Sequence, residues 1–285
     1  MGGMIRVLGL ALGVWSVTAF SSTLVGFEPF QVVDKQGVRF VSIPAGQFIM
    51  GTSDAVRKRL EQKEWWNRFL ESELPAHRVI INQPFLIGQT EVTQAQWKAI
   101  MGEDHSELAF KGEDRPVDSV SFRDVKRFLK ALNERSEDRF RLPTEAEWEY
   151  CCRAGDWGAF MIGENGQSIS ESDLAGYCWL KGNSKGKTQI VGGRKSNGWG
   201  LHDMLGNVWE WCEDFYDRDA YRMRSEPAIS PLNGRPFPER VMRGGSWFLS
   251  EAFQRAGVRS GFGEERRSPY VGFRLVCEQV SKKGG

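Results

Sequence analysis

The sequence predicts an α+β domain with little regular secondary structure. Short apolar stretches of strand length occupy the first third of the chain, a few capped helices follow up to about residue 155, and regular patterning then becomes sparse. The 285 residues include 32 glycines and 11 tryptophans. Glycine favours turns, and each large aromatic side chain buries about 150–250 Å². This composition favours a fold of many loops held together by aromatic contacts.

The strands are predicted from short runs of β-branched, aromatic and aliphatic residues bounded by turn residues. The first two strands are expected to form a hairpin. After them, residues 53–71 place mixed charges around Trp65 and Trp66, which predicts a helix with a solvated face and an aromatic side packed on the domain. The predicted strands are residues 40–46, 47–51, 77–81 and 85–88.

Three helices are predicted from their N-terminal capping residues, Thr93, Ser121 and Thr144. The clearest start is at Thr144, where the hydroxyl group and the Glu147 carboxylate are spaced to form a capping box. Gly155 is expected to end that helix, because glycine readily adopts the left-handed conformation found after helix C-termini. The predicted helices are residues 94–101, 122–135 and 145–154.

The first residues have the pattern of an export signal. Arg6 precedes an uncharged, mainly apolar stretch that ends at Phe20 and is shorter than the roughly 20 residues of a membrane span. Small residues follow it, which is typical of a cleaved signal. We therefore predict a signal peptide at 1–22, an N-terminal extension at 23–37, a domain at 38–280 and a disordered tail at 281–285, in a periplasmic or secreted protein. An uncleaved N-terminal anchor is the alternative.

The charge balance excludes one class of partner. The chain has 38 Lys and Arg against 37 Asp and Glu, a net charge of +1. Such a chain has no long-range field that would attract a polyanion, so we expect no nucleic-acid partner. No second apolar run is long enough to span a bilayer, so an integral membrane protein is not expected after signal cleavage. Three widely spaced histidines and the absence of a CxxC pair argue against a histidine metal centre or a zinc knuckle.

Several short segments, taken in order, resemble one protein family. They are IPAG at 43–46 with MG at 50–51, EVT at 91–93, RLPTEAEWEY at 141–150, GLHDMLGNVWEW at 200–211, RGGSW at 243–247 and GFR at 272–274. Each alone is a weak signal, but the ordered set resembles the formylglycine-generating enzyme family, whose domain is also called the sulfatase-modifying-factor domain. The resemblance covers about residues 38–277. It implies the formylglycine-generating-enzyme fold, which is similar to the C-type lectin fold.

The segment 200–211 bears on metal binding. Asp203 and Glu210 place two carboxylates around Gly206, and oxygen ligands of this kind suit Ca²⁺. Spacing alone favours a simpler interpretation, a capping aspartate and a salt-bridged glutamate. The family resemblance implies a structural calcium ion with side-chain ligands at Asp203 and Glu210 and carbonyl ligands at Gly206 and Val208. A second family calcium site is a poorer match, because Gly176 stands where an asparagine ligand is expected.

The resemblance also implies that the family's copper chemistry is absent. In formylglycine-generating enzymes the Gly-Gly-Ser stretch is followed by two cysteines, whose thiolates bind Cu(I) and support oxidation of a substrate cysteine. Here Leu249 and Gln254 occupy those positions, and neither supplies the soft thiolate that Cu(I) requires. We therefore expect no copper and assign no catalytic residue. The remaining candidate cleft consists of Trp209, Ser246 and Trp247 together with Leu249 and Gln254.

The five cysteines are expected to be structural. The resemblance implies a disulfide between Cys152 and Cys277, with Cys277 displaced by two residues from the family position, and Cys151 is the alternative partner. The sequence does not assign Cys178 or Cys212. An inert buried thiol is the simpler interpretation for Cys212, since no neighbouring cation or base activates it.

Two functions are compatible with these observations. The first is an exported accessory or regulatory protein without formylglycine-generating activity, which binds an envelope protein or peptide partner in the former substrate cleft, for example in the regulation of type VI secretion. The alternative is an enzyme for the periplasmic oxidative maturation of a siderophore chromophore of the pyoverdine type by non-copper chemistry. A carbohydrate-binding role rests on fold analogy alone, which is a weak argument. The sequence does not predict the oligomeric state.

Overall fold

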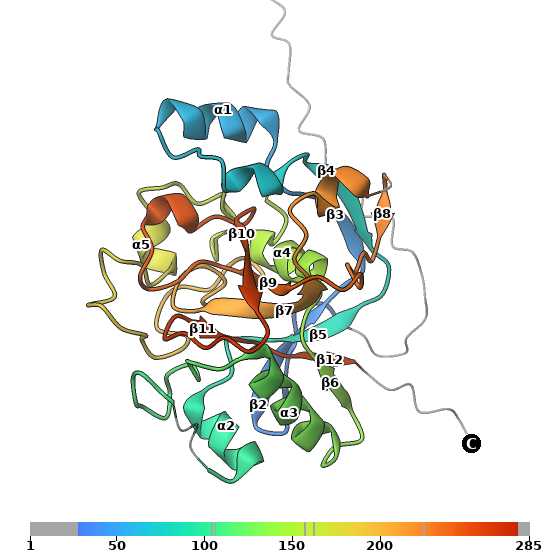
Figure 1. The fold of residues 1–285 in the computed structure, drawn as a ribbon, viewed down its shortest axis with the longest axis vertical. Coiled ribbons are helices and arrows are strands. Elements are labelled where there is room, and N and C mark those ends of the chain that lie inside the picture. Colours follow the sequence, from blue (N-terminus) through green and yellow to red (C-terminus); the bar gives the residue numbers. More distant parts are fainter. Residues whose placement is uncertain are drawn as a thin grey trace, which may run out of the picture.

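The computed structural model describes residues 28–278, apart from 104, 106, 157, 162 and 225. The predicted signal peptide at 1–22 and tail at 281–285 therefore lie outside the described residues. Within the described part of the chain, no helix is long and apolar enough to cross a membrane. Figure 1 shows α2 (Gln94–Met101) and α3 (Phe122–Asn133) at one end of the long axis and α1 (Asp54–Gln62) at the other, with α4 (Glu145–Arg153) and β7 (Trp209–Phe215) between them.

The largest sheet has five strands and is antiparallel throughout. Their order is β1 (Val32–Lys35), β2 (Val38–Ile43), β5 (Phe85–Gly88), β12 (Val276–Glu278) and β6 (Arg139–Arg141). The segment predicted as an N-terminal extension thus contributes the edge strand β1, and a strand from the end of the domain lies between β5 and β6.

Two smaller sheets complete the framework. One has four strands in the order β10 (Arg259–Gly263), β9 (Glu239–Arg243), β7 (Trp209–Phe215) and β11 (Val271–Gly272). The other has three, in the order β3 (Gly46–Met50), β4 (His77–Ile81) and β8 (Ala228–Ile229). In each sheet the shortest strand, β11 or β8, runs parallel to its neighbour and the other pairs are antiparallel.

The predicted hairpin between the first two strands is wrong. β2 pairs with β1 and β5, whereas β3 pairs with β4 in a different sheet. Pro44 separates β2 from β3, and proline has no N–H to continue a ladder of hydrogen bonds. Five of the six β2 residues are buried, so this strand requires partners along both edges rather than a single hairpin partner. The predicted strands at 77–81 and 85–88 are confirmed as β4 and β5.

The helices follow their capping signals. Thr93, Ser121 and Thr144 each form a capping box with the residue three positions later. α4 ends at Arg153, one residue earlier than predicted, and Ala154 rather than Gly155 is the left-handed cap, at φ 48°. The α-helices are α1 (Asp54–Gln62), α2 (Gln94–Met101), α3 (Phe122–Asn133), α4 (Glu145–Arg153) and α5 (Leu174–Tyr177), and the 3₁₀ helices are η1 (Leu70–Glu73), η2 (Ala220–Met223) and η3 (Glu251–Phe253).

The helix predicted for residues 53–71 is shorter than expected. α1 ends at Gln62, and Glu64 then adopts φ 59°, a left-handed conformation that stops helical propagation. Beyond this turn Trp66 is half-buried, and its Nε1 donates a hydrogen bond to Glu71 at 2.9 Å. The aromatic pair therefore belongs to a turn that covers the domain, and not to a continuous helix face.

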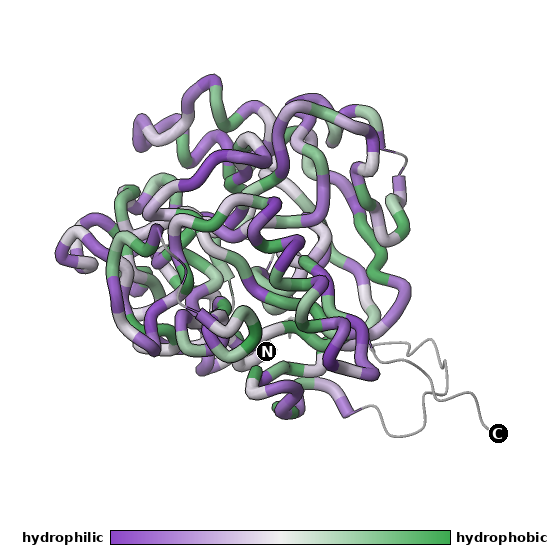
Figure 2. Tube along the Cα trace, turned by 60° about the horizontal axis from the view of Figure 1, so that its bottom comes forward, coloured by the Kyte–Doolittle hydropathy of each residue, from purple (hydrophilic) through white to green (hydrophobic). Residues whose placement is uncertain are grey.

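The hydrophobic core has two parts. One includes Trp148 on α4 and Val276 on β12, and the other includes Phe128 on α3 and Phe140 on β6. Along the strands of the five-stranded sheet, successive side chains pack alternately into one part of the core and the other, because neighbouring residues of a β-strand point to opposite faces. Figure 2 shows hydrophobic and hydrophilic residues interleaved along the chain path. Both faces of the central sheet are thus covered, and the site loops are built on this rigid frame.

Candidate functional site

The loop after β9 is built around two glycines. Gly244 and Gly245 have φ of 97° and 73°, and an added Cβ at Gly245 would lie 2.5 Å from the Gln254 Oε1 atom. The Gln254 Nε2 atom donates hydrogen bonds to the carbonyl oxygens of Ser246 at 2.9 Å and Leu249 at 3.4 Å. The family resemblance places a copper-binding thiolate at position 254. The buried Gln254 carboxamide instead stabilises the loop through these two hydrogen bonds.

Two polar atoms in this loop remain unpartnered. The Ser246 Oγ and Gln254 Oε1 atoms are buried, and neither has a hydrogen-bond partner among the described residues. Leaving a buried polar group unpaired costs about 1–3 kcal/mol. A nucleophilic serine requires an adjacent base, and the Ser246 hydroxyl contacts none in the described part of the chain. This pair is a polar spot beneath the surface, and its geometry is not that of an activated nucleophile.

An aromatic surface lies over this loop. Trp247 packs edge to face against Phe110 and Phe248, with ring centroids 5.5 and 5.6 Å apart, and Phe248 stacks on Tyr270 at 6.4 Å. Phe248 is 54% exposed. We call Phe110, Trp247, Phe248 and Tyr270 the aromatic platform. Of the predicted cleft residues, Trp209 is buried in the core on β7, so it does not contribute to this surface.

Sequence reasoning missed three of the four platform residues. Phe110, Phe248 and Tyr270 come from separate loops, so no local spacing joins them. The one available signal was Phe248 itself, a large apolar residue directly after the Trp247 of a recognised motif. Contacts between distant loops, which the sequence does not specify, create the surface.

The predicted calcium loop holds a buried ion pair. The Arg274 guanidinium donates to both oxygens of Glu210 at 2.6 and 2.7 Å, and the Trp148 Nε1 atom donates to the same carboxylate at 2.8 Å. All three side chains are fully buried. The salt-bridged glutamate considered for the sequence is therefore present, and the oxygens of Glu210 are already engaged.

Two further buried carboxylates lie near that pair. Asp203 accepts a hydrogen bond from the Gly192 N–H at 2.6 Å through Oδ2, while its Oδ1 atom and both carboxylate oxygens of Glu91 have no partner among the described residues. Burial raises the pKa of Asp203 to about 6. Burial, and next the charge of Asp203, raise the pKa of Glu91 well above its usual value. When Asp203 and Glu91 are ionised, their negative charges therefore lack ion-pair partners.

This donor set bears on calcium binding. The three unpartnered oxygens of Glu91 and Asp203 are hard donors of the kind that Ca²⁺ takes, so these two residues fit the ion. Glu210 fits less well, because Arg274 neutralises it. Among the described residues no group of three or more His, Cys, Asp or Glu side chains is arranged to hold a metal, so an ion at this position requires backbone carbonyls such as those of Gly206 and Val208. Sequence reasoning missed Glu91, although it begins the EVT segment.

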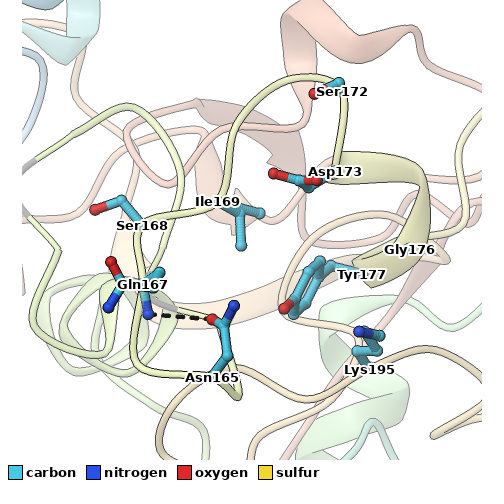
Figure 3. A pocket seen from close by; sticks show the side chains of 9 residues that line it. All are labelled: Asn165, Gln167, Ser168, Ile169, Ser172, Asp173, Gly176, Tyr177 and Lys195. Carbon is cyan, nitrogen blue, oxygen red and sulfur yellow. Dashed lines mark hydrogen bonds between the residues drawn. The ribbon is translucent and has the colours of Figure 1, made fainter.

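The second predicted calcium position lies at a polar pocket of about 390 Å³. Figure 3 shows Gly176, Tyr177 and Lys195 on one side of it and Asp173 above them. The Asp173 carboxylate accepts hydrogen bonds from the backbone N–H and the hydroxyl group of Ser170 at 3.1 and 2.6 Å. Gly176 supplies no side-chain oxygen. Position 176 therefore lacks the asparagine ligand that the family resemblance would require.

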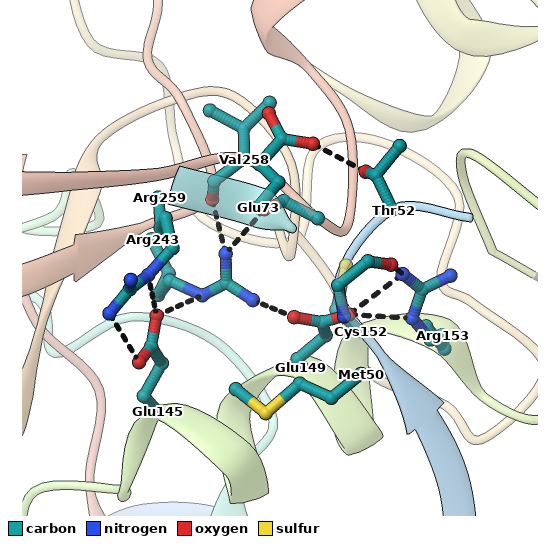
Figure 4. A network of polar contacts seen from close by, with 12 residues as sticks. Met50, Thr52, Glu73, Glu145, Glu149, Cys152, Arg153, Arg243, Val258 and Arg259 are labelled. Atoms are coloured by element: carbon teal, nitrogen blue, oxygen red, sulfur yellow. Dashed lines mark hydrogen bonds and ion pairs between the residues drawn. The ribbon is translucent and has the colours of Figure 1, made fainter. Parts of the chain in front are cut away.

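The helix α4 carries acidic residues of a buried ionic network. Figure 4 shows Arg243 of β9 between Glu145 and Glu149. Its Nη2 atom contacts Glu149, its Nε atom lies 3.7 Å from Glu145, and Arg259 holds Glu145 through two hydrogen bonds of 2.6 and 2.9 Å. Burial would raise the pKa of Glu145, but Arg259 and then Arg243 lower it to about 2. The network links α4 to the strands that precede and follow the candidate loop.

The predicted Cys152–Cys277 disulfide is absent. All five cysteines are free and buried. Cys152 lies on α4 in one part of the core, whereas Cys277 lies on β12 in the other part. Side chains alternate along a strand, so Val276 points towards the core of α4 and Cys277 points away from it. The displacement by two residues keeps the face of Leu275, and that face is the one opposite to Cys152.

None of the thiols has the character of a reactive group. Burial raises the pKa of Cys152 and Cys277 to about 12, and it raises the pKa of Cys151, Cys178 and Cys212 as well. The nucleophile and metal ligand in cysteine chemistry is the thiolate. These cysteines are therefore packed apolar groups, which confirms the inert interpretation of Cys212.

We predict that a thiol reagent will detect all five cysteines in protein unfolded without reductant. Titration with a chromogenic disulfide such as Ellman's reagent should give the same number before and after treatment with reductant. In the folded protein the reaction should be slow, because every thiol is buried. A count lower by two in the unreduced sample would show that a disulfide forms and would contradict the free state.

One known protein family matches most of the chain. Residues 28–279 match the sulfatase-modifying factor enzyme 1-like domain. The chain belongs to this family. The family's α+β fold with short helices and strands is the one described above, and the sequence resemblance is confirmed.

Several relatives of this sulfatase-modifying-factor protein are similar over much of its length. The chaperone protein LppX of Paenibacillus barcinonensis is 30% identical over 237 residues, covering 67% of this chain and 79% of LppX. The formylglycine-generating enzyme of Mycobacterium tuberculosis is 28% identical over 204 residues, covering 67% of this chain and 66% of the enzyme. The match spans about half of the Bos taurus enzyme, 51%.

Solved structures of similar extent share the fold. PvdO from Pseudomonas aeruginosa matches with a TM-score of 0.73 and 27% identity, covering 89% of this chain and all of PvdO (100%). Treponema denticola variable protein 1 matches with a TM-score of 0.71 and 26% identity, covering 87% of this chain and 99% of that protein. Each of these two solved chains is therefore matched over almost its whole length.

Proposed function

We propose that this protein is an exported accessory protein that binds an envelope protein or peptide partner and does not generate formylglycine. The observation that carries the proposal is the replacement of both copper-binding positions, where Leu249 supplies a hydrocarbon side chain and Gln254 a carboxamide held by backbone carbonyls. The exposed aromatic platform beside them offers a surface for recognition. The similarity to LppX, which is named as a chaperone protein, supports a binding role, and regulation of type VI secretion is one setting.

The absence of copper chemistry has a direct test. We expect the wild-type protein to compete poorly for Cu(I) against a chromophoric chelator and to leave the cysteine of a sulfatase-type peptide unchanged by mass spectrometry. The double variant Leu249→Cys/Gln254→Cys should gain Cu(I) binding, because two thiolates then face the same loop. Tight Cu(I) binding or peptide oxidation by the wild-type protein would disprove this part of the proposal.

Partner binding is tested by a photo-crosslinking amino acid placed at Phe248, with the same group at Phe69 as the control. Phe69 is 68% exposed and Phe248 54% exposed, so both probes reach solvent, but Phe69 lies outside the platform. In periplasmic extract we expect discrete adducts from position 248 and none of the same mass from position 69. Identical adducts at both positions, or none at position 248, would count against a partner at the platform.

A second candidate is the oxidative maturation of a siderophore chromophore of the pyoverdine type. The observation that favours it is the unpartnered Ser246 hydroxyl and Gln254 carbonyl in the loop that carries Trp247 and Phe248, where polar groups and aromatic rings would together suit a polar aromatic precursor. The extent of the PvdO match is compatible with a complete domain of this kind. Turnover of such a precursor under oxygen, above the rate of a Ser246→Ala variant, would favour the enzyme over the accessory protein.

We also propose that a structural calcium ion is held at Asp203 and Glu91 with the carbonyls of Gly206 and Val208. The support for it is the charge imbalance described above, in which three buried carboxylates share one guanidinium. Calcium would supply the missing positive charge and fix the loop that precedes β7. Glu210 would orient that loop through Arg274.

A further inference from the structure

A short basic loop borders the aromatic platform. Lys181, Lys185 and Lys187 lie in a segment with no acidic residue between positions 181 and 190. All three lysines are exposed, and none of their side chains has an ion pair or hydrogen bond with any described residue. Many other cations of the chain are already neutralised, as Arg255 is by Glu73 at 2.9 Å. The loop therefore presents three uncompensated positive charges to solvent.

Hydrogen bonds fix this loop next to the platform. The Lys181 N–H donates to the carbonyl oxygen of Leu249 at 2.9 Å, and the Ser184 hydroxyl donates to the carbonyl oxygen of Trp247 at 2.9 Å. Glu251 lies close to the loop, since its Oε1 atom would be 3.9 Å from an added Cβ at Gly182. The loop itself carries three ammonium groups and no carboxylate, so this edge of the platform carries a local positive charge.

The platform supplies the apolar half of the surface. Phe248 and Tyr270 stack at an interplanar angle of 18°, while Trp247 is held by a 3.0 Å hydrogen bond from its Nε1 atom to the Pro269 carbonyl. Rigid aromatic side chains give a large contact area at a low cost in conformational entropy. A ligand that fits both halves must have an apolar or aromatic side chain for the rings and carboxylates for the lysines.

We infer that the partner segment recognised here is an acidic peptide with an aromatic or aliphatic anchor, in which the anchor packs on Phe248 and Tyr270 and the carboxylates pair with Lys181, Lys185 and Lys187. This inference rests on the proposed binding function and names the chemistry of its partner. The charge of the loop favours Asp and Glu residues beside the anchor. Exposed ion pairs are individually weak, and the three together set specificity and association rate more than total affinity.

An acidic peptide fits this surface better than a nucleic acid. Tight nucleic-acid binding uses about 6–10 phosphate contacts, whereas the loop has three lysines in a chain of net charge +1. The platform is also a cluster of mutually packed rings and not a row of separate stacking positions along a groove, which single-stranded nucleic acids require. The positive charge is local, and its reach matches a few carboxylates on one peptide.

The test is selection of displayed random peptides on the full-length protein. We expect enrichment of peptides with two or more Asp or Glu residues next to Trp, Phe, Tyr or Leu. In fluorescence polarisation, the triple variant Lys181→Gln/Lys185→Gln/Lys187→Gln should bind a selected peptide about tenfold more weakly, in line with weak individual ion pairs. Replacing Asp and Glu in the peptide by Asn and Gln should cause a similar loss.

A matched control removes the same net charge elsewhere. Lys58 and Arg59 on α1 and Lys130 on α3 are exposed, and their combined replacement by Gln should change the affinity less than about twofold, because they belong to neither the basic loop nor the platform and exposed charges are screened by salt. Enrichment of neutral or basic peptides, no enrichment, or equal losses in both triple variants would overturn the inference. If a DNA duplex or anionic vesicles bind as tightly as the peptide, and the Lys181→Gln/Lys185→Gln/Lys187→Gln variant loses that binding, the inference is overturned in favour of a general polyanion site. If Phe248 crosslinks a partner whose binding the lysines do not affect, the inference fails while the proposed function stands.

Discussion

Replacing Arg243 by Met should lower the free energy of unfolding by about 3–5 kcal/mol, the usual cost of removing one partner from a buried ion pair. Arg243 is fully buried, and Glu149 and Glu145 both depend on its charge. It also donates to the carbonyls of Gly257 and Val258 at 3.1 and 2.5 Å, which would lose their donor. For a domain of this size the melting temperature should fall by roughly 6–20 °C. Urea unfolding followed by tryptophan fluorescence measures the effect.

The matched control for this variant is Arg123→Met. Arg123 pairs with Glu265 at the surface, where the two side chains are 67% and 62% exposed, so its removal should cost less than about 1 kcal/mol. The double variant Arg243→Met/Glu149→Gln should be less destabilised than the sum of the two single variants, because the uncompensated carboxylate is then removed as well. Equal effects at Arg243 and Arg123 would show that the buried network contributes nothing particular.

Calcium should raise the melting temperature of chelator-treated protein by about 5–10 °C at a concentration a hundredfold above the dissociation constant. This figure follows from about 2.7 kcal/mol of linkage stabilisation in a domain of this length. The variants Glu91→Gln and Asp203→Asn should lose most of the increment. Asp173→Asn in the polar pocket should keep it, because that carboxylate is hydrogen-bonded to Ser170 and exposed. Differential scanning fluorimetry with calcium and with magnesium gives the comparison.

The calcium increment should depend on pH in one direction. Burial raises the pKa of Asp203 from 3.8 to about 6, so below that value the folded protein holds a proton where the ion would bind. A raised carboxyl pKa means that the folded state takes up protons more readily than the unfolded state, and proton binding competes with calcium. The increment should therefore be large at pH 7.5 and small at pH 5. An increment that does not change with pH, or that survives in Glu91→Gln and Asp203→Asn, would place calcium elsewhere.

The helices and the strands β4 and β5 could be predicted from local signals, and the longest strand could not. Thr93, Ser121 and Thr144 act within four residues of their partners, so a capping box is visible in a short stretch of sequence. The longest strand, β7, lies after residue 155, where the sequence predicts only loops and short strands because the apolar runs are short. Glu210 and Asp214 within it are fully buried. Arg274 neutralises Glu210, whereas backbone N–H groups donate to Asp214 at 2.7 Å.

The candidate site could likewise be predicted from the sequence only in part. The motif around Gly244 and Gly245 could be located from the sequence, and so could the loss of the copper thiolates at Leu249 and Gln254. The platform could not, because its rings come from separate loops. The disulfide prediction failed for a related reason. A family position gives the strand and the face on which Cys277 lies, but not which part of the core that face points into.

The position of β12 has a consequence for the order in which the molecule is assembled. β12 lies near the end of the described chain, yet it pairs with β5 on one side and with β6 on the other. Until residues 276–278 are available, those two strands have no common neighbour, and the five-stranded sheet exists only as separate pieces. Such long-range pairing slows folding, since segments far apart in the sequence must be brought together at a cost in entropy before their stabilising contacts form. A shortened chain that stops before Val276 would therefore retain its capped helices and still leave the central sheet open.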